Sequence, residues 1–260
     1  MIADYRLGES GLPALLLHCM LGRARDLGGL VAALKTPLDA RAFDLPGHGA
    51  SEPWDEATGY HDLCTTLAQA RLPDGGVIIG HSFGATVALR LALDNPGTLR
   101  ALVLIEPVLF AAARGSAEAA EQAPHDDALA EAFSQSDMAT AAAGFLAQWG
   151  AGPPYAAMPR DAQARIAARM PMVMAAGADL HADRAGLLRP GALEDCTLPV
   201  LLLRGKASPV VTRAVNRTLA QRLPDARSSE IAGAGHMLPL THATQTADAI
   251  DNFLDDLPIP

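Results

Sequence analysis

The chain has 260 residues, half of them apolar, which is enough to bury one large hydrophobic core. Its 20 Lys and Arg residues against 29 Asp and Glu residues give a formal net charge of −9, so no overall positive field attracts phosphate backbones or anionic lipid. We therefore expect one globular domain that binds neither nucleic acid nor a membrane, and the composition leaves the oligomeric state open.

The N-terminal segment and the cysteines favour a cytoplasmic protein without a bound metal. Asp4 and Glu9 fall where a signal peptide would have a basic region and then an apolar run, and no later segment has the length of a membrane span. Cys19, Cys64 and Cys196 are odd in number and widely separated, unlike a zinc site or a disulfide framework. We expect no metal and no disulfide.

Short apolar runs, followed by turn residues and helical periodicity, recur at both ends of the chain. Such runs are typical of buried parallel strands, and apolar residues three and four apart are typical of the connecting helices. The expected strands are residues 14–17, 41–44, 77–80, 101–105, 199–204 and 227–231. The expected helices are residues 26–35, 60–71, 83–95, 212–223 and 241–254. This alternation predicts an α/β fold, with a mostly parallel sheet and helices on both faces.

The alternation is interrupted by residues 107–195, which are rich in Ala, helical in pattern and without a clear strand. We expect them to form a helical lid inserted after the sixth core strand, with residues 1–106 and 196–260 as the core. Proline and glycine positions predict several short helices rather than one long helix. The expected breaks are at Pro124, Gly150 to Pro154, Pro159, Pro171 and Gly177.

The insert also holds Trp149 and a group of methionines, which either line an apolar pocket or form the insert's own core. We expect most of them to be core residues. The methionines are Met158, Met170, Met172 and Met174.

Residues 77–84, VIIGHSFG, place a Gly-x-Ser-x-Gly motif directly between an expected strand and an expected helix. This context is typical of a nucleophile elbow, a strained turn that exposes a serine hydroxyl above the sheet. Gly80 and Gly84 are small enough to let the strand and helix backbones approach. We predict that Ser82 is a nucleophile and that the backbone amide of Phe83 faces a developing oxyanion. A chance match of so short a motif is the alternative.

Two further loops carry the features of a known family. Residues 15–22, LLLHCMLG, and residues 44–51, DLPGHGAS, each cover the end of an expected strand and the loop after it. The chain resembles the α/β-hydrolase family, in its serine hydrolase branch with a lid, whose members commonly have His-Gly-x-x-Gly in the first loop and Asp-x-Pro-Gly-x-Gly-x-Ser in the second. The resemblance implies that the backbone amide of Met20 is the second oxyanion donor. Cys19 replaces the family's glycine, and we expect a small buried side chain there, with a nucleophilic thiol as the alternative.

The general base is expected late in the chain, because this fold uses the order nucleophile, acid, histidine. His236 lies in residues 231–239, IAGAGHMLP, a glycine-rich loop after an expected strand. Of the eight histidines, it alone lies in the expected loop. His242 is the nearest alternative, and His81 is expected to pack beside Ser82 rather than to act as the base.

The position of the acid departs from the usual pattern. Most family members have an aspartate shortly after the strand at 199–204, where this chain has Ser208, whose hydroxyl cannot supply a negative charge. Glu106 ends the previous strand, and the haloalkane-dehalogenase branch of the family uses a glutamate in this place. We predict that Glu106 is the orienting acid and that Ser208→Ala has little effect, with a purely structural Glu106 as the alternative. Weaker candidates are Asp179, Asp183 and Asp195.

Together these residues predict a triad of Ser82, His236 and Glu106, with Met20 and Phe83 as oxyanion donors, acting on a small-molecule substrate without a cofactor. Three functions remain open. The first is hydrolysis of a small carboxylic ester, thioester or lactone through an acyl-enzyme. The second is carbon–carbon bond hydrolysis or a lyase step, which similar serine members perform. The third is a ligand-binding protein of the same fold without turnover. The departures from the family pattern at Cys19 and Ser208 are the reason to consider it.

Overall fold

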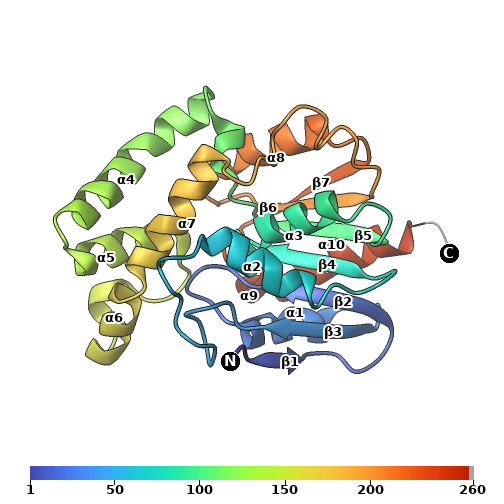
Figure 1. Ribbon diagram of the computed structural model, residues 1–260, viewed down its shortest axis with the longest axis horizontal. Helices are drawn as coiled ribbons and strands as arrows, with labels where there is room; N and C mark the ends of the chain where they lie inside the picture. The colour runs from blue at the N-terminus through green and yellow to red at the C-terminus, as the bar shows by residue number, and fades with distance from the viewer. Residues whose placement is uncertain (258–260) are drawn as a thin grey trace.

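The computed structural model describes residues 1–257, in which seven strands form one sheet in the order β1-β3-β2-β4-β5-β6-β7 (Figure 1). All neighbouring strands are parallel except β1 and β3, which pair antiparallel. The strands are β1 (Asp4–Arg6), β2 (Leu12–Leu17), β3 (Leu38–Phe43), β4 (Val77–His81), β5 (Ala101–Ile105), β6 (Val200–Gly205) and β7 (Ala226–Ile231). The strands β2 to β7 all run in one direction, so their carboxyl ends meet at one edge of the sheet. The loops at this edge of a parallel sheet are where ligands bind.

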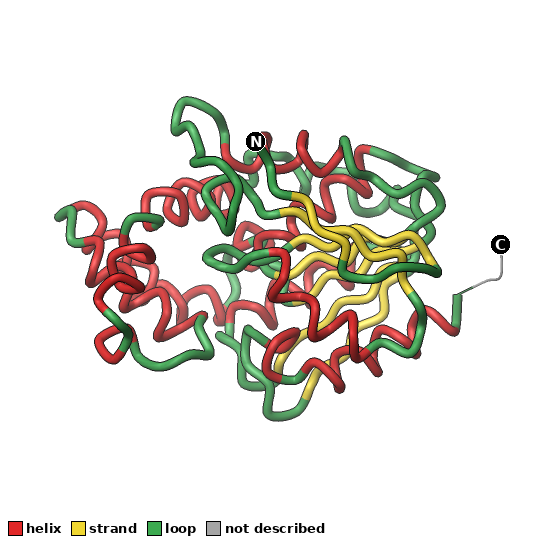
Figure 2. The backbone as a smooth tube through the Cα atoms, turned by 90° about the horizontal axis from the view of Figure 1, so that it is seen from below, coloured by secondary structure: helices red, strands yellow, loops and turns green. Residues whose placement is uncertain are grey.

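Helices cover both faces of the sheet, and Figure 2 shows the strands in yellow between helices in red. Alternate residues of each strand enter separate core clusters: Leu102 and Leu104 of β5 belong to one, Val103 and Ile105 to the other. The first cluster is completed by α2 (Tyr60–Gln69), α3 (Phe83–Asp94) and α8 (Val211–Arg222). The second is completed by η1 (Ala24–Leu27), α1 (Gly28–Ala33), α9 (Leu238–Thr241) and α10 (Ala243–Asp255). Burial on both faces explains why β2, β4, β5 and β6 are mainly apolar.

The expected strands and core helices are all present, with boundary shifts. The expected helix 26–35 is divided into η1 and α1, and the expected helix 241–254 is divided into α9 and α10. The short edge strand β1 was not predicted, because its residues alternate between exposed and half-buried and carry no apolar run.

The segment from 107 to 195 contains helices and no strand, and it follows β5, the fifth strand of the chain rather than a sixth. Its elements are η2 (Phe110–Ala113), α4 (Ala117–Ser134), α5 (Met138–Trp149), η3 (Tyr155–Ala157), α6 (Arg160–Ala167) and α7 (Met170–Ala182). The expected breaks at Pro124 and Gly177 are wrong, because both residues lie inside helices, α4 and α7. Pro124 is exposed, and so is Ala120, whose carbonyl loses its helical donor, so water can replace that bond. Glycine only lowers helix propensity, by about 1 kcal/mol relative to alanine.

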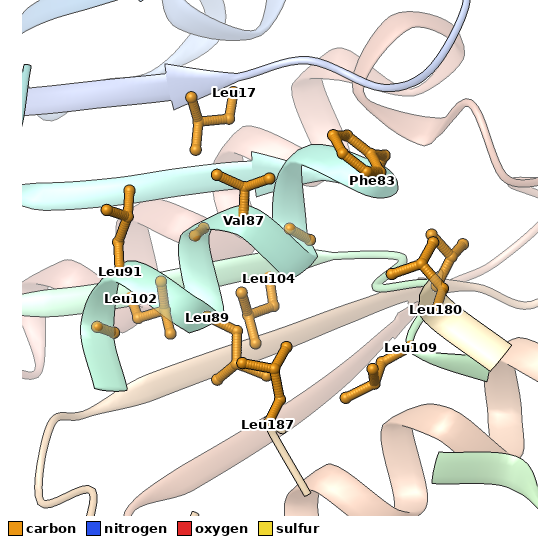
Figure 3. Packing of buried hydrophobic residues seen from close by; sticks show 14 of the residues in the cluster. Leu17, Phe83, Val87, Leu89, Leu91, Leu102, Leu104, Leu109, Leu180 and Leu187 are labelled. Carbon is orange, nitrogen blue, oxygen red and sulfur yellow. The ribbon is translucent and has the colours of Figure 1, made fainter. Parts of the chain in front are cut away.

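This insert, residues 107–195, packs partly on the core and partly on itself. Leu109, Leu180 and Leu187 join the cluster around Leu89 of α3, and Figure 3 shows them together. A smaller cluster is formed within the insert by Ala132, Ala141, Ala142, Met170 and Val173. Figure 1 shows α4, α5 and α6 farther from the sheet than α7. None of the helices within residues 1–257 combines the length and the hydrophobicity needed to cross a bilayer.

Candidate active site

Ser82 lies at the turn from β4 into α3, at the carboxyl edge of the sheet. Its backbone has φ 58° and ψ −118°, a strained conformation that costs a non-glycine residue about 1–3 kcal/mol. The turn is tight: a Cβ on Gly84 would lie 2.3 Å from the carbonyl oxygen of Leu17, and a Cβ on Gly80 would lie 2.5 Å from Cα of Ala85. These contacts leave no room for a side chain at either glycine, which accounts for the motif.

His236 lies in the loop after β7 and reaches Ser82 across the sheet edge. Its Nε2 is 2.9 Å from Oγ of Ser82, and its ring is buried. The edge of the Trp149 indole packs against the imidazole, with ring centroids 4.7 Å apart and planes at 75°. The serine hydroxyl therefore has a hydrogen-bonded imidazole positioned to accept its proton.

Glu106 follows β5 directly and points at the other nitrogen of the same imidazole. Its Oε2 is 3.0 Å from Nδ1 of His236, and the residue is fully buried. Its Oε1 accepts hydrogen bonds from the backbone amide of Gly205 at 2.6 Å and from the hydroxyl of Ser208 at 2.7 Å. A buried carboxylate with three partners is satisfied rather than orphaned.

The hydroxyl of Ser208 donates a hydrogen bond to Glu106, so the expectation that Ser208 has little effect is revised. The sequence shows only that Ser208 cannot replace an aspartate. The missed signal is that β5 and β6 are neighbours, so side chains that follow their carboxyl ends are brought together.

Met20 and Phe83 both line the pocket that contains Ser82 and His236. Phe83 is the first residue of α3, where a backbone amide has no intrahelical acceptor. Within the described residues, the hydrogen bonds include none donated by the backbone amide of Met20 or of Phe83. In residues 1–257, both amides therefore lack a hydrogen-bond acceptor and line the pocket that contains Ser82.

The loop that carries Met20 is fixed by two buried histidines. Nε2 of His18 accepts a hydrogen bond from the amide of Leu45 at 2.9 Å, and Nε2 of His48 accepts one from the amide of Leu21 at 2.9 Å. The loops after β2 and β3 are thereby cross-linked. Cys19 is buried beside them, and burial raises the pKa of its thiol to about 12. A thiol that holds its proton so firmly is a poor nucleophile, in agreement with a packing role.

His81 precedes Ser82 but faces away from its hydroxyl. Nε2 of His81 lies 2.9 Å from the backbone carbonyl oxygen of His236. Burial lowers the pKa of His81 to about 3, so the ring is neutral and donates its Nε2–H to that carbonyl. His242 lies at the surface, where its Nδ1 contacts the hydroxyl of Thr241. Neither histidine takes the place of His236.

A pocket of about 360 Å³ opens onto Ser82 and is roofed by the insert. Its walls are mainly apolar and come from η2, α4, α5 and α7 of the insert. The lining includes Phe110, Leu129, Phe145, Trp149, Val173, Met174 and Leu180, together with Asp126, Asp127 and His181 near α4 and α7. Of the methionines singled out in the insert, Met174 lines the pocket, whereas Met170 and Met172 are buried in core clusters.

The weaker acid candidates lie elsewhere. Asp179 pairs with Arg184, Asp183 accepts the amides of Leu187 and Leu188, and none of Asp179, Asp183 and Asp195 lines the pocket around Ser82. Within residues 1–257 no three His, Cys, Asp or Glu side chains are grouped as a metal ion would require.

The fold agrees with comparison to known proteins. A model of the alpha/beta hydrolase family matches residues 14–249, and the chain belongs to that family. It is accordingly an enzyme of the hydrolase class.

Among named relatives, the pimeloyl-(acyl-carrier protein) methyl ester esterase of Aromatoleum aromaticum is 29% identical, over 86% of this chain and 91% of that protein. The 2-(acetamidomethylene)succinate hydrolase of Mesorhizobium japonicum is 27% identical, over 95% and 89%. Among solved structures, a hydrolase from Pseudomonas aeruginosa aligns with a TM-score of 0.68 at 23% identity, over 97% of this chain and 94% of that one. The last likeness bears on the fold alone.

Proposed function

We propose that the chain is a serine hydrolase that cleaves a small carboxylic ester, thioester or lactone through a Ser82–His236–Glu106 triad. The observation that carries the proposal is the unbroken series of hydrogen bonds from Ser82 Oγ to His236 and from His236 to Glu106, at 2.9 and 3.0 Å. Both distances are those of hydrogen bonds, and His236 lies between the serine hydroxyl and the carboxylate, as proton transfer from Ser82 requires. No cofactor takes part in the proposed reaction.

In the first half of the cycle, Nε2 of His236 takes the proton of Ser82 as Oγ attacks the substrate carbonyl. The amides of Met20 and Phe83 stabilise the negative charge that develops on the carbonyl oxygen. Glu106 keeps the proton of His236 on Nδ1 and stabilises the imidazolium. His236 then gives its new proton to the leaving alcohol or thiol, and an acyl-enzyme on Ser82 remains.

In the second half, His236 takes a proton from water, and the resulting hydroxide attacks the acyl carbon. The tetrahedral intermediate collapses, Ser82 recovers its proton from His236, and the carboxylic acid leaves. The unpaired amides at Met20 and Phe83 support this step equally, because the same oxygen becomes negative again.

We further propose that the insert, residues 107–195, is a lid domain on a core formed by residues 1–106 and 196–260. The insert supplies most of the pocket wall, whereas Ser82, Glu106 and His236 belong to the core. The core therefore supplies the reaction, and the insert supplies the specificity.

The pocket favours an ester over the carbon–carbon bond of a dienoate. A dienoate substrate carries a carboxylate, but no Lys or Arg is among the pocket-lining residues in the described chain, and Asp126 and Asp127 are. A ligand-binding protein without turnover is disfavoured, because the two departures at Cys19 and Ser208 leave the hydrogen-bond series intact.

A fluorophosphonate probe and p-nitrophenyl esters test the proposal. We expect covalent labelling at Ser82 and turnover of short esters, both lost in Ser82→Ala. Cys19→Ala is the matched control, because it removes a nearby thiol and should keep both signals. Absence of labelling and of ester turnover in the native chain would refute the proposal, and preferred turnover of a dienoate would replace it with the carbon–carbon reaction.

A further inference from the structure

Gly177 lies in the middle of α7, where a glycine lowers helix stability by about 1 kcal/mol relative to alanine. Two common reasons for such a glycine do not hold here. It is not among the glycines with positive φ. A Cβ built on it would meet no heavy atom within 4 Å, so no close neighbour excludes a side chain.

Gly177 faces the pocket over Ser82. Val173 and Leu180, one turn before it and one turn after it, line that pocket together with Gly177 itself. Residues spaced by three and four share one face of a helix, so a side chain at 177 would project between these two. The missing side chain therefore adds to the volume of the pocket rather than to the packing of the insert.

The walls around this space define what it accepts. Phe110, Phe145 and Trp149 supply aromatic surface that favours apolar groups. The carboxyl groups that line the pocket in residues 1–257 are those of Asp126 and Asp127, and they disfavour an anionic group. His181 also lines the pocket, with its Nε2 3.8 Å from Oδ2 of Asp126.

We propose that Gly177 is a specificity-determining residue, whose lack of a side chain leaves room for an uncharged apolar acyl chain longer than an acetyl group. This inference rests on the proposed ester hydrolysis. It assigns the acyl part of the substrate to the space between α4, α5 and α7, and it assigns the length of that acyl part to one position in α7.

The test compares Gly177→Ala and Gly177→Leu with a matched control, Gly144→Leu. Gly144 also lies inside a helix, α5, and a Cβ there also meets no heavy atom within 4 Å, but Gly144 is exposed and does not line the pocket. The measured quantity is the ratio of kcat/KM for p-nitrophenyl octanoate to that for p-nitrophenyl acetate. Because the ratio compares two esters on one enzyme preparation, partial unfolding of a variant does not change it.

We expect Gly177→Leu to lower the ratio by roughly 10-fold or more, the range by which a few methylene groups alter selectivity in an apolar pocket. Gly177→Ala should lower it less, and Gly144→Leu should leave it at the native value. An unchanged ratio in Gly177→Leu, or an equal fall in Gly144→Leu, would overturn the inference.

The charge of the acyl group is tested on the native protein with two p-nitrophenyl esters of equal length, the hexanoate and the half-ester of adipate. We expect the hexanoate to have a kcat/KM higher by about 10-fold or more, since the adipate chain ends in a carboxylate. Equal rates or a preference for the adipate would overturn the proposed substrate class. Failure of the proposed function would differ from both results, because no ester would be turned over and Ser82 would not be labelled.

Discussion

The core and the insert are held in place in different ways. Core loops at the site are tied by buried polar groups: Asp44, for example, accepts hydrogen bonds from the hydroxyl of Tyr5 and from the amides of Ala24 and Ala50. The insert rests on apolar packing and on a few surface contacts with the core. If the proposed function holds, the more heavily hydrogen-bonded region fixes the reaction geometry, and the insert, held mainly by apolar packing, determines which substrates fit.

Two of these contacts come from different segments of the insert and reach different parts of the core. Nε of Arg169, before α7, donates to the backbone carbonyl of Gly47 at 3.0 Å. Glu118, in the first turn of α4, pairs with Arg217 of α8 at 2.7 Å, and this hydrogen-bonded pair lowers the pKa of Glu118 to about 2. The following changes probe the contrast between the two regions, from the largest expected effect to the smallest.

The largest effect should come from Glu106→Gln in the core. The Gln amide can donate to Nδ1 of His236, which favours the tautomer that cannot accept the proton of Ser82. We expect kcat for a short p-nitrophenyl ester to fall roughly 10³–10⁴-fold, with an unchanged melting temperature within a few degrees. Near-native turnover in this variant would remove Glu106 from the triad.

Gly84→Ala compares core packing with packing in the insert. The added methyl would collide with the backbone of Leu17, so we expect unfolding in urea to require about 2–3 kcal/mol less free energy. The matched change in the insert, Gly144→Ala, adds a methyl in open space and should stabilise by up to about 1 kcal/mol. Equal losses in the two variants would contradict the contrast.

Ser208→Ala removes one of the two core hydrogen bonds to Oε1 of Glu106, while Gly205 still donates the other. We expect kcat/KM to fall by roughly 10-fold, the equivalent of one charged hydrogen bond. Ser208 contacts Glu106 and does not line the pocket, so the fall should lie in kcat, with KM nearly unchanged.

The matched control for Ser208 is Ser208→Thr, which keeps the hydroxyl. Threonine should restore most of kcat. An unchanged kcat in Ser208→Ala would assign Ser208 a structural role alone.

The smallest effect should follow alkylation with iodoacetamide at pH 8. Burial raises the pKa of Cys19 to about 12 and raises those of Cys64 and Cys196, so few thiolates form at this pH. We expect no loss of ester turnover over the time in which free cysteine is consumed. Rapid inactivation, with carboxamidomethyl groups found on Cys19 by mass spectrometry, would revive the thiol as a nucleophile.

The same contrast explains what could be predicted from the sequence. Buried strands such as β4 and β5 are continuous apolar runs, and Ser82 stands in a motif whose two glycines are demanded by backbone contacts within a few ångströms. The local sequence is therefore enough to predict the core strands and the turn at Ser82. Glu106 could also be identified as a candidate from the sequence, because a carboxylate stands out directly after a fully apolar strand.

The remainder depended on contacts between distant segments. The hydrogen bond between Ser208 and Glu106 spans 102 positions, and no local pattern encodes it. Helix α4 has weak periodicity in an Ala-rich sequence, so Pro124 suggested a break that α4 does not have. Gly177 was interpreted as a helix breaker, although its significance lies in the pocket that it faces.

The contact between Ser208 and Glu106 also explains why this chain has no aspartate at position 208. A second carboxylate there would meet Oε1 of Glu106 in a buried site, and two carboxylates so close share one proton instead of both ionising. A Glu106 that held the shared proton could not stabilise the imidazolium of His236, so an aspartate at position 208 would oppose the role proposed for Glu106. The hydroxyl at position 208 instead donates a hydrogen bond to that carboxylate and adds no charge.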